Sequence, residues 1–127
     1  MSTFSGLSDA EAMQFTGRWL PAWTGNDPER LLAFYAVDAI YSDPAVPAGI
    51  HGHVEIRAYF RRLLARYPDW VWTNTGVRSL SGGFLNYWHA VIPDKERTIE
   101  CDGVCVVLIE KGLIVRNEVF FDRTPLW

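Results

Sequence analysis

From Trp70 onward the chain is a series of β-rich runs separated by short turns. The runs cover Trp70–Leu80, Phe84–Ile92, Thr98–Ile109 and Leu113–Phe121. Each run is rich in aromatic and β-branched residues, and the turns between them contain Gly, Pro, Asp or Lys. Successive strands joined by such short turns pair antiparallel. The second part of the chain is therefore predicted to be a four-stranded antiparallel meander.

Helical periodicity characterises the chain before this region. A first helix is predicted to start at Ser8 or Asp9, because Glu11 completes a capping box with Ser8. Its apolar positions lie on one helical face: Ala12, Phe15, Trp19, Ala22 and Trp23. Pro21 lies within the pattern, so a kink or an early end is expected there.

Two further helices are predicted before the strands. Asp27 followed by Pro28 is an N-cap signal, and the short helix after it is expected to contain Leu31, Leu32, Phe34 and Tyr35. The third helix is predicted over Gly52–Tyr67. Helices grouped ahead of strands are typical of an α+β fold. A length of 127 residues predicts one domain over residues 1–127.

The composition is ordinary for a globular protein except for its aromatic residues, with six Trp, five Tyr and seven Phe. Aromatic side chains fill a core or line a cavity, and this number suggests a cavity for a hydrophobic small molecule. The net charge of −3 offers no basic surface for nucleic acid. No apolar run is long enough to cross a bilayer, and no signal pattern is visible. We expect a soluble, cytoplasmic protein without a membrane partner.

The two cysteines, Cys101 and Cys105, lie four residues apart on one predicted strand. In an extended strand this spacing separates their Cα atoms by about 13 Å, which is beyond the reach of a disulfide. We therefore expect reduced, structural thiols. Two Cys and three scattered His form no zinc-binding pattern, and neither a metal nor another cofactor is predicted.

Asp43 ends a short apolar segment and precedes Pro44, and a loop rich in Pro and Gly then leads into the third helix. Pro44 disfavours the α conformation for Asp43 and so holds this carboxylate on a stiff, extended backbone. A carboxylate at a strand end beside a cavity suits general acid/base chemistry. The Asp-Pro pair is also common in turns, where the carboxylate only caps the loop. The sequence leaves both roles open.

The predicted strands are apolar on both faces. In the second run, Phe84 and Trp88 alternate with Leu85 and Tyr87. One face must pack against the helices. The other face also needs cover, and we expect a homodimer that forms through this outer face of the sheet.

Motifs spread over nearly the whole chain carry a resemblance to a known family: Arg18-Trp19, Asn26-Asp27, Phe34–Ala39, Ser42–Pro44, Gly49–Gly52, Ile56–Tyr59 and Gly112–Asp122. They resemble the nuclear transport factor 2 (NTF2)-like superfamily, and within it the SnoaL-like polyketide cyclases and ketosteroid isomerases. The resemblance implies a cone-shaped fold with three N-terminal helices packed on a curved, mainly antiparallel sheet. This fold hosts isomerases, cyclases, dehydratases, epoxide hydrolases and non-enzymes, so it does not specify the reaction.

The resemblance places Asp43 where a ketosteroid isomerase has its general-base aspartate. In that family a Tyr and a protonated Asp hold the enolate oxygen. Here Trp19 stands at the Tyr position, and Cys105 falls near the position of the protonated Asp. A steroid-isomerase oxyanion hole is therefore not expected, and we do not predict that activity.

Other candidate site residues are the aromatic and polar side chains expected around the cavity. The proposed ligand contacts are Trp19, Tyr41, Tyr59, Trp88, Cys105 and Asn117. Core packing explains the aromatic ones equally well, whereas the amide of Asn117 must find a partner if it is buried. Asp122 is a second candidate catalytic carboxylate, but strand alternation puts it on the face opposite Phe121. A bulge could turn it into the cavity, and otherwise a terminal cap is expected.

These observations lead to a main functional hypothesis and two alternatives. The main one is a cofactor-independent isomerase, cyclase or dehydratase, in which Asp43 transfers protons on a hydrophobic carbonyl or polycyclic compound. Epoxide hydrolysis, which would need an Asp-Arg-Asp set facing the cavity, is the alternative among enzymes. A non-catalytic binding or dimerisation module is the alternative outside them. An open cavity of roughly 300 Å³ or more with converging polar groups would favour an enzyme, and an Asp43 that only caps backbone amides would favour the module.

Overall fold

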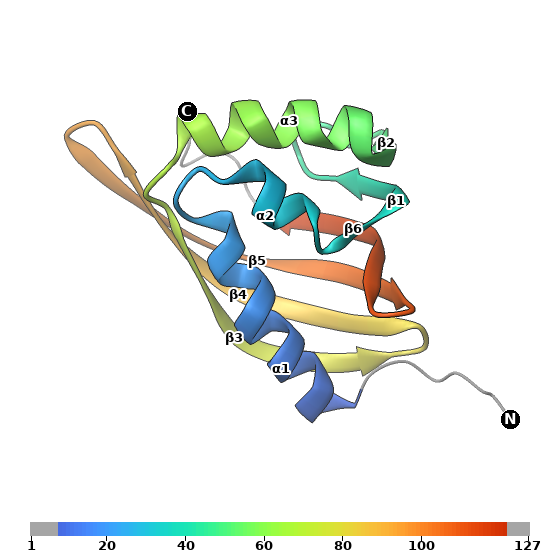
Figure 1. Ribbon diagram of the computed structural model, residues 1–127. Helices are drawn as coiled ribbons and strands as arrows, with labels where there is room; N and C mark the ends of the chain where they lie inside the picture. The colour runs from blue at the N-terminus through green and yellow to red at the C-terminus, as the bar shows by residue number, and fades with distance from the viewer. Residues whose placement is uncertain (1–7, 122–127) are drawn as a thin grey trace, which may run out of the picture.

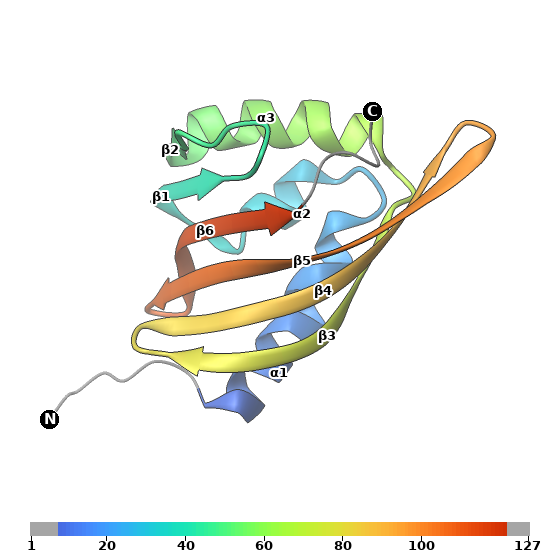
Figure 2. The ribbon, with the colours of Figure 1, turned by 180° about the vertical axis from the view of Figure 1, so that it is seen from behind.

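The computed structural model describes residues 8–121, in which helices cover one face of a single curved sheet (Figure 1). Six strands form the sheet in the order β2-β1-β6-β5-β4-β3. Seen from behind, the opposite face of the sheet carries no helix (Figure 2). The predicted α+β class and the curved, mainly antiparallel sheet are confirmed, and the apolar core lies between the helices and the concave face.

The first helix, α1 (Asp9–Trp19), begins at the predicted capping box. The Glu11 backbone N–H donates to Ser8 Oγ at 3.1 Å, and the Ser8 N–H donates to Glu11 Oε1 at 2.9 Å. The helix ends just before Pro21, and a 3₁₀ helix, η1 (Leu20–Trp23), follows. Pro21 therefore ends the α-helix, as expected from its missing N–H and fixed φ.

The second helix, α2 (Pro28–Leu32), starts at Asp27, whose side chain accepts the Arg30 N–H at 3.2 Å. It is shorter than predicted, because Tyr35 begins strand β1 (Tyr35–Ser42) instead of continuing the helix. Just before this strand, the Ile114 N–H donates to the Phe34 carbonyl at 2.8 Å. Pairing with a distant strand has overridden the local helical pattern.

Strand β1 pairs with β6 (Leu113–Phe121) in parallel and with the short β2 (Ile50–His51) antiparallel. Helix α3 (Gly52–Arg66) follows β2 immediately and closely matches its predicted range. Gly49 and Gly52 have φ of +89° and +80°, a region that favours glycine. These two residues let the chain turn from the Asp43 loop back into β2 and α3.

The predicted meander is confirmed as β3 (Val71–Leu80), β4 (Gly83–Asp94), β5 (Arg97–Glu110) and β6. The β4 and β5 strands extend further than predicted, and Asp94 still pairs with Arg97. The segment between the two predicted runs, residues 93–97, is thus reduced to a turn of Lys95 and Glu96, and Lys95 adopts a positive φ of 59°. Because the two strands stay paired up to this tight turn, the β4–β5 hairpin projects well beyond the rest of the sheet (Figure 1).

Strand alternation divides the sheet into an inner and an outer face. Phe84 and Trp88 are buried on the inner face, whereas Tyr87 and Phe120 are 39% and 52% exposed on the outer one. The register shifts between Asn74 and Gly76 in β3, and such a bulge increases the bend of a strand. The bend lets the inner face enclose a space under the helices instead of packing flat against them.

Cys101 and Cys105 are free thiols, as their spacing on one strand predicted. None of the helices within residues 8–121 is long and apolar enough to cross a membrane. The same residues contain no cluster of three His, Cys, Asp or Glu side chains suited to a metal ion.

Candidate functional site

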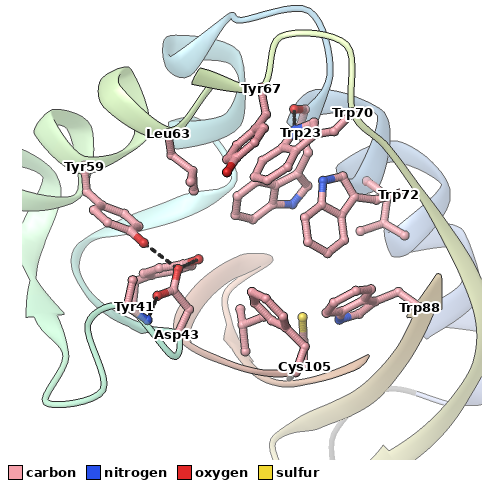
Figure 3. Close-up of a pocket in the computed structure, with 14 residues that line it drawn as sticks. Trp23, Tyr41, Asp43, Tyr59, Leu63, Tyr67, Trp70, Trp72, Trp88 and Cys105 are labelled. Atoms are coloured by element: carbon pink, nitrogen blue, oxygen red, sulfur yellow. Dashed lines mark hydrogen bonds between the residues drawn. The ribbon is translucent and has the colours of Figure 1, made fainter. Parts of the chain in front are cut away.

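A cavity of about 210 Å³ lies between α3, η1 and the concave face of the sheet (Figure 3). Its lining is almost entirely apolar or aromatic and is formed by Leu20, Trp23, Tyr41, Asp43, Ala45, Tyr59, Leu63, Tyr67, Trp70, Trp72, Trp88, Cys105, Val119 and Phe121. Asp43 is the single carboxylate among these described residues. The cavity is thus a partly open, hydrophobic space with one acidic group at its edge.

Asp43 follows the last residue of β1 and is only 8% exposed. Its Oδ1 accepts the backbone N–H groups of Ala45 at 2.8 Å and of Val46 at 3.2 Å. The Val46 N–H also donates to the Asp43 carbonyl at 3.0 Å, which closes a tight turn around Pro44. The turn holds the carboxylate in one orientation and leaves Oδ2 directed at the cavity wall (Figure 3).

Two tyrosines bind the other carboxylate oxygen. The Tyr41 hydroxyl donates to Asp43 Oδ2 at 2.8 Å and the Tyr59 hydroxyl donates to the same atom at 2.7 Å. Tyr41 lies two residues earlier on β1, so it shares a strand face with Asp43, whereas Tyr59 reaches in from α3. Their rings pack with centroids 5.6 Å apart.

The electrostatics of this cluster favour a carboxylate held by neutral donors. Burial raises the pKa of Tyr41 well above its ordinary value of 10, and the nearby charge of Asp43 raises it further. Tyr41 therefore remains a protonated donor throughout the physiological range. Hydrogen bonds donated to an anion are stronger than those between neutral groups, so four donors stabilise the ionised Asp43 without a positive charge.

Four tryptophans form the opposite wall of the cavity (Figure 3). The rings of Trp70 and Trp72 meet edge to face at 4.9 Å and 82°, and those of Trp72 and Trp88 at 4.3 Å and 69°. The Trp70 indole N–H donates to the carbonyl of Trp23, which anchors this wall to η1. Edge-to-face contacts of this kind stabilise aromatic clusters and fix the rings at steep angles to one another.

The sheet below Trp88 contains a glycine for a steric reason. A Cβ at Gly103 would lie 2.2 Å from Trp88 Cζ2 and 2.6 Å from the Phe120 carbonyl oxygen. Cys105, also on β5, is beside the Trp88 ring, and burial raises the pKa of its thiol to about 12. Cys105 therefore contributes a neutral thiol to the cavity lining and not a nucleophilic thiolate.

The structure brings together five of the eight predicted site residues: Asp43, Tyr41, Tyr59, Trp88 and Cys105. Trp19 is fully buried in the core and does not line the cavity. Asn117 is likewise buried outside it, and its side-chain amide donates to the Tyr35 hydroxyl at 3.0 Å. The amide of Asn117 thus has a partner within the protein. Asp122 lies outside the described residues.

Several wall residues were not identified from the sequence, among them Trp23, Tyr67, Trp70 and Trp72. Trp70 and Trp72 have the two-residue spacing of one strand face, which could have indicated a shared wall. No comparable signal exists for Trp23, which reaches the cavity because η1 follows α1 at Pro21.

Comparison with solved structures finds proteins of the same fold. A Catenulispora acidiphila protein with a ketosteroid isomerase-like fold, solved in complex with trimethylamine, has a TM-score of 0.77 and 19% identity over 86% of this chain and 85% of its own. AclR of Streptomyces galilaeus, named as a candidate hydroxylase, has a TM-score of 0.76 and 12% identity over 94% of both chains. An epoxide hydrolase of the LEH-like type from M. tuberculosis has a TM-score of 0.73 and 17% identity over 90% of this chain and 84% of its own.

At these identities the likeness concerns the fold alone. A comparison with curated protein sequences finds no match. A sequence profile of the SnoaL-like domain, however, matches residues 16–117, which include α3, the Asp43 loop and most of the sheet. Together with the shared fold, this match shows that the chain belongs to the SnoaL-like domain family of the NTF2-like superfamily.

Proposed function

We propose that this protein is a cofactor-independent enzyme in which Asp43 transfers protons on a small hydrophobic molecule held in the cavity. The reaction would be an isomerisation, a cyclisation or a dehydration, and the substrate a carbonyl-bearing or polycyclic compound. One observation carries the proposal: a carboxylate that is 8% exposed lines an otherwise apolar cavity. Families of this fold include such enzymes, and the Catenulispora relative was solved with a small organic molecule.

The hydrogen bonds of Asp43 specify how the proton would move. A carboxylate has about four acceptor positions, and all four are occupied by Ala45, Val46, Tyr41 and Tyr59. A substrate proton can reach Oδ2 when one tyrosine hydroxyl turns aside. Tyr59 is the half-buried one of the two, so its hydroxyl is better placed to turn. The aromatic wall would exclude water and so strengthen the interaction between substrate and carboxylate.

Hydrogen–deuterium exchange at carbon tests this proposal without knowledge of the natural substrate. A panel of hydrophobic ketones in deuterated buffer would be followed by NMR, with the wild type and with Asp43→Asn. We expect exchange to fall by about 10²- to 10⁴-fold in Asp43→Asn, the range typical of a lost general base. Asp38→Asn, an exposed carboxylate on the same strand, is the matched control and should retain full activity. Equal exchange in wild type and Asp43→Asn for every ketone that exchanges would refute the catalytic role.

Asparagine is a suitable replacement because its side-chain carbonyl can still accept the Ala45 and Val46 N–H groups. Tyrosine hydroxyls can act as donors or acceptors, so they can reorient toward the amide group that the substitution introduces. We therefore expect the melting temperature to change little, which separates loss of catalysis from loss of folding.

A non-catalytic binding module remains the second candidate. The observation in its favour is that Asp43 Oδ1 caps two backbone amides, as a purely structural residue would. The cavity volume of about 210 Å³ is also below the usual range for drug-sized ligands. Nothing in the described wall supports epoxide hydrolysis, since Asp43 is its one carboxylate and it contains no arginine.

We also propose that two copies of the chain associate through the outer face of the sheet. Tyr87, Val104 and Phe120 are register partners across β4, β5 and β6, which places an apolar row on that face. Arg116 and Glu118 lie beside it and supply both signs of charge, as a self-complementary twofold interface requires. Sedimentation of the wild type and of Phe120→Glu tests this, with a dimer expected only for the wild type.

A further inference from the structure

The described cavity wall contains aromatic rings and the Asp43 carboxylate, and three of its hydrogen-bond donors already have partners within the protein. The hydroxyls of Tyr41 and Tyr59 donate to Asp43, and the Trp70 N–H donates to a backbone carbonyl. The indole nitrogens of Trp72 and Trp88 are buried within the wall. A ligand in the cavity would meet ring surfaces and the hydroxyl of Tyr67 on one side and the Asp43 carboxylate on the other (Figure 3).

The described cavity wall carries negative charge and no positive charge. Among the lining residues that the structure describes, Asp43 is charged and none is Lys, Arg or His. The nearest basic groups recorded at the cavity rings are outside the lining: Arg62 Cζ is 5.9 Å from the Tyr59 ring centre, and Arg66 Cζ is 4.6 Å from that of Tyr67. The arginine contacts show that these two tyrosine rings already interact with cations. Among the described residues of the wall, the carboxylate of Asp43 has no positive partner.

The arrangement of the rings suits a compact, weakly hydrated cation. The face of an aromatic ring attracts positive charge, most strongly for Trp, and desolvation strengthens the contact. The rings of Trp70 and Trp72 are nearly perpendicular, and those of Trp72 and Trp88 are steeply inclined to each other. Steeply angled rings form a corner whose surfaces can contact several methyl groups of one ligand at once. The negative field of Asp43 reaches the same space through a medium of low polarity.

We infer that the ligand of this cavity is a hydrophobic compound carrying an alkylated ammonium group, bound between the tryptophan wall and Asp43. The inference rests on the proposed function, because it takes the cavity to be the substrate site. A positive charge on the substrate would stabilise the negative charge that develops on carbon as Asp43 removes a proton.

Three probes of matched shape and different charge test the inference. Choline carries a trimethylammonium group, neohexyl alcohol has a tert-butyl group in its place, and the carboxylate of tert-butylacetic acid has the same tert-butyl group with a negative charge. Binding to the full-length protein would be measured by calorimetry and by tryptophan fluorescence. We expect choline to bind about tenfold more tightly than the alcohol, and the anion to bind most weakly. Equal or tighter binding of the alcohol, or no binding of choline, would overturn the inference.

Two substitutions test whether the aromatic wall causes the preference for choline over the alcohol. Trp72→Leu keeps an apolar side chain but removes the ring, and should reduce choline affinity about tenfold with little change for the alcohol. Tyr67→Leu removes a half-buried ring of the same cavity. This variant replaces Trp72→Leu in the test if Trp72→Leu does not fold. Asp38→Asn controls for the general loss of one negative charge and should leave choline binding unchanged. An equal loss for both probes in the ring variants would mean that shape, and not charge, determines binding.

The exchange assay with Asp43→Asn separates failure of this inference from failure of the proposed function. If the alcohol equals choline but Asp43→Asn abolishes exchange on neutral ketones, the cation site is refuted and the enzyme stands. If choline is preferred but Asp43→Asn never changes exchange, the catalytic proposal is refuted and the cation site stands.

Discussion

Two carboxylates of this protein are almost equally buried, but they are stabilised in different ways. Asp43 is 8% exposed and receives four hydrogen bonds from neutral groups. Asp94, at the end of β4, is 9% exposed and lies near two arginines, 3.1 Å from Arg66 and 3.9 Å from Arg97. Two positive charges compensate Asp94, whereas the charge of Asp43 has no basic partner in the described wall.

The difference supports the proposal that Asp43, rather than Asp94, has a role beyond folding. An ion pair neutralises a buried charge within the protein and leaves little field for a ligand. Neutral donors stabilise an anion but leave its net charge in place, so the cavity beside Asp43 retains a negative potential. Burial alone would not have distinguished the two residues. The nature of their partners does.

Among the substitutions that test this difference between Asp43 and Asp94, Tyr41→Phe is expected to lower the free energy of unfolding the most. The change removes one donor from Asp43 at a side chain that is only 2% exposed, so bulk solvent has little access to replace it. Hydrogen bonds to charged groups contribute about 1.5–3 kcal/mol, so the free energy of unfolding should fall by about 2 kcal/mol in urea denaturation.

Tyr59→Phe provides the internal control for that measurement. Tyr59 is half-buried, so solvent can partly replace its hydroxyl, and a loss of about 1 kcal/mol is expected. A loss in Tyr59→Phe that equals or exceeds that in Tyr41→Phe would contradict the idea that burial makes the Tyr41 bond the stronger one.

A smaller loss of stability is expected for Arg66→Ala, which removes one of the two arginines near Asp94. The Arg66 side chain is 53% exposed, and Arg97 remains near Asp94. The loss of unfolding free energy should therefore be about 1 kcal/mol, close to the value of a surface ion pair, and carbon exchange at the cavity should not change. Arg62→Ala, one turn earlier on α3, should cost less because it removes no ion pair recorded among the described residues. Loss of catalytic exchange in Arg66→Ala alone would show that Asp94 and the cavity are coupled.

The smallest effect concerns a second pair of carboxylates, which are exposed and whose histidine partner is charged only at lower pH. Asp102 and Glu100 bind the two ring nitrogens of His89 at 2.8 and 2.9 Å, and these bonds, that of Asp102 first, raise the pKa of His89 above 6.5. Stability from a histidine with a raised pKa is present below its unfolded pKa and is lost as pH rises through the folded pKa. His89→Gln should thus lower the melting temperature slightly at pH near 6 and not at pH near 9. A decrease of the same size at both pH values would contradict this.

Much of the fold could be predicted because its signals are local. Glu11 capping Ser8, Pro21 ending a helix and the four β-rich runs all depend on neighbours in the sequence, and all are confirmed. Tyr35 was wrongly placed in a helix, because its pairing partner is Ile114 in β6, near the other end of the chain. Contacts between such distant residues leave no trace in a short sequence window.

The candidate site likewise combines features that the local sequence predicts with features that only tertiary packing decides. By itself the sequence determined the stiff Asp43-Pro44 turn and the alternation that puts Phe84 and Trp88 on one face of their strand, because fixed φ and a two-residue period are properties of the backbone. Which face points into the cavity was decided by the packing of the helices on the sheet. Only the tertiary structure decided that Tyr59 meets Asp43, that Trp23 joins the wall, and that Trp19 and Asn117 do not. These outcomes depend on how α3 and η1 pack over a bent sheet, and therefore on contacts among residues far apart in the chain.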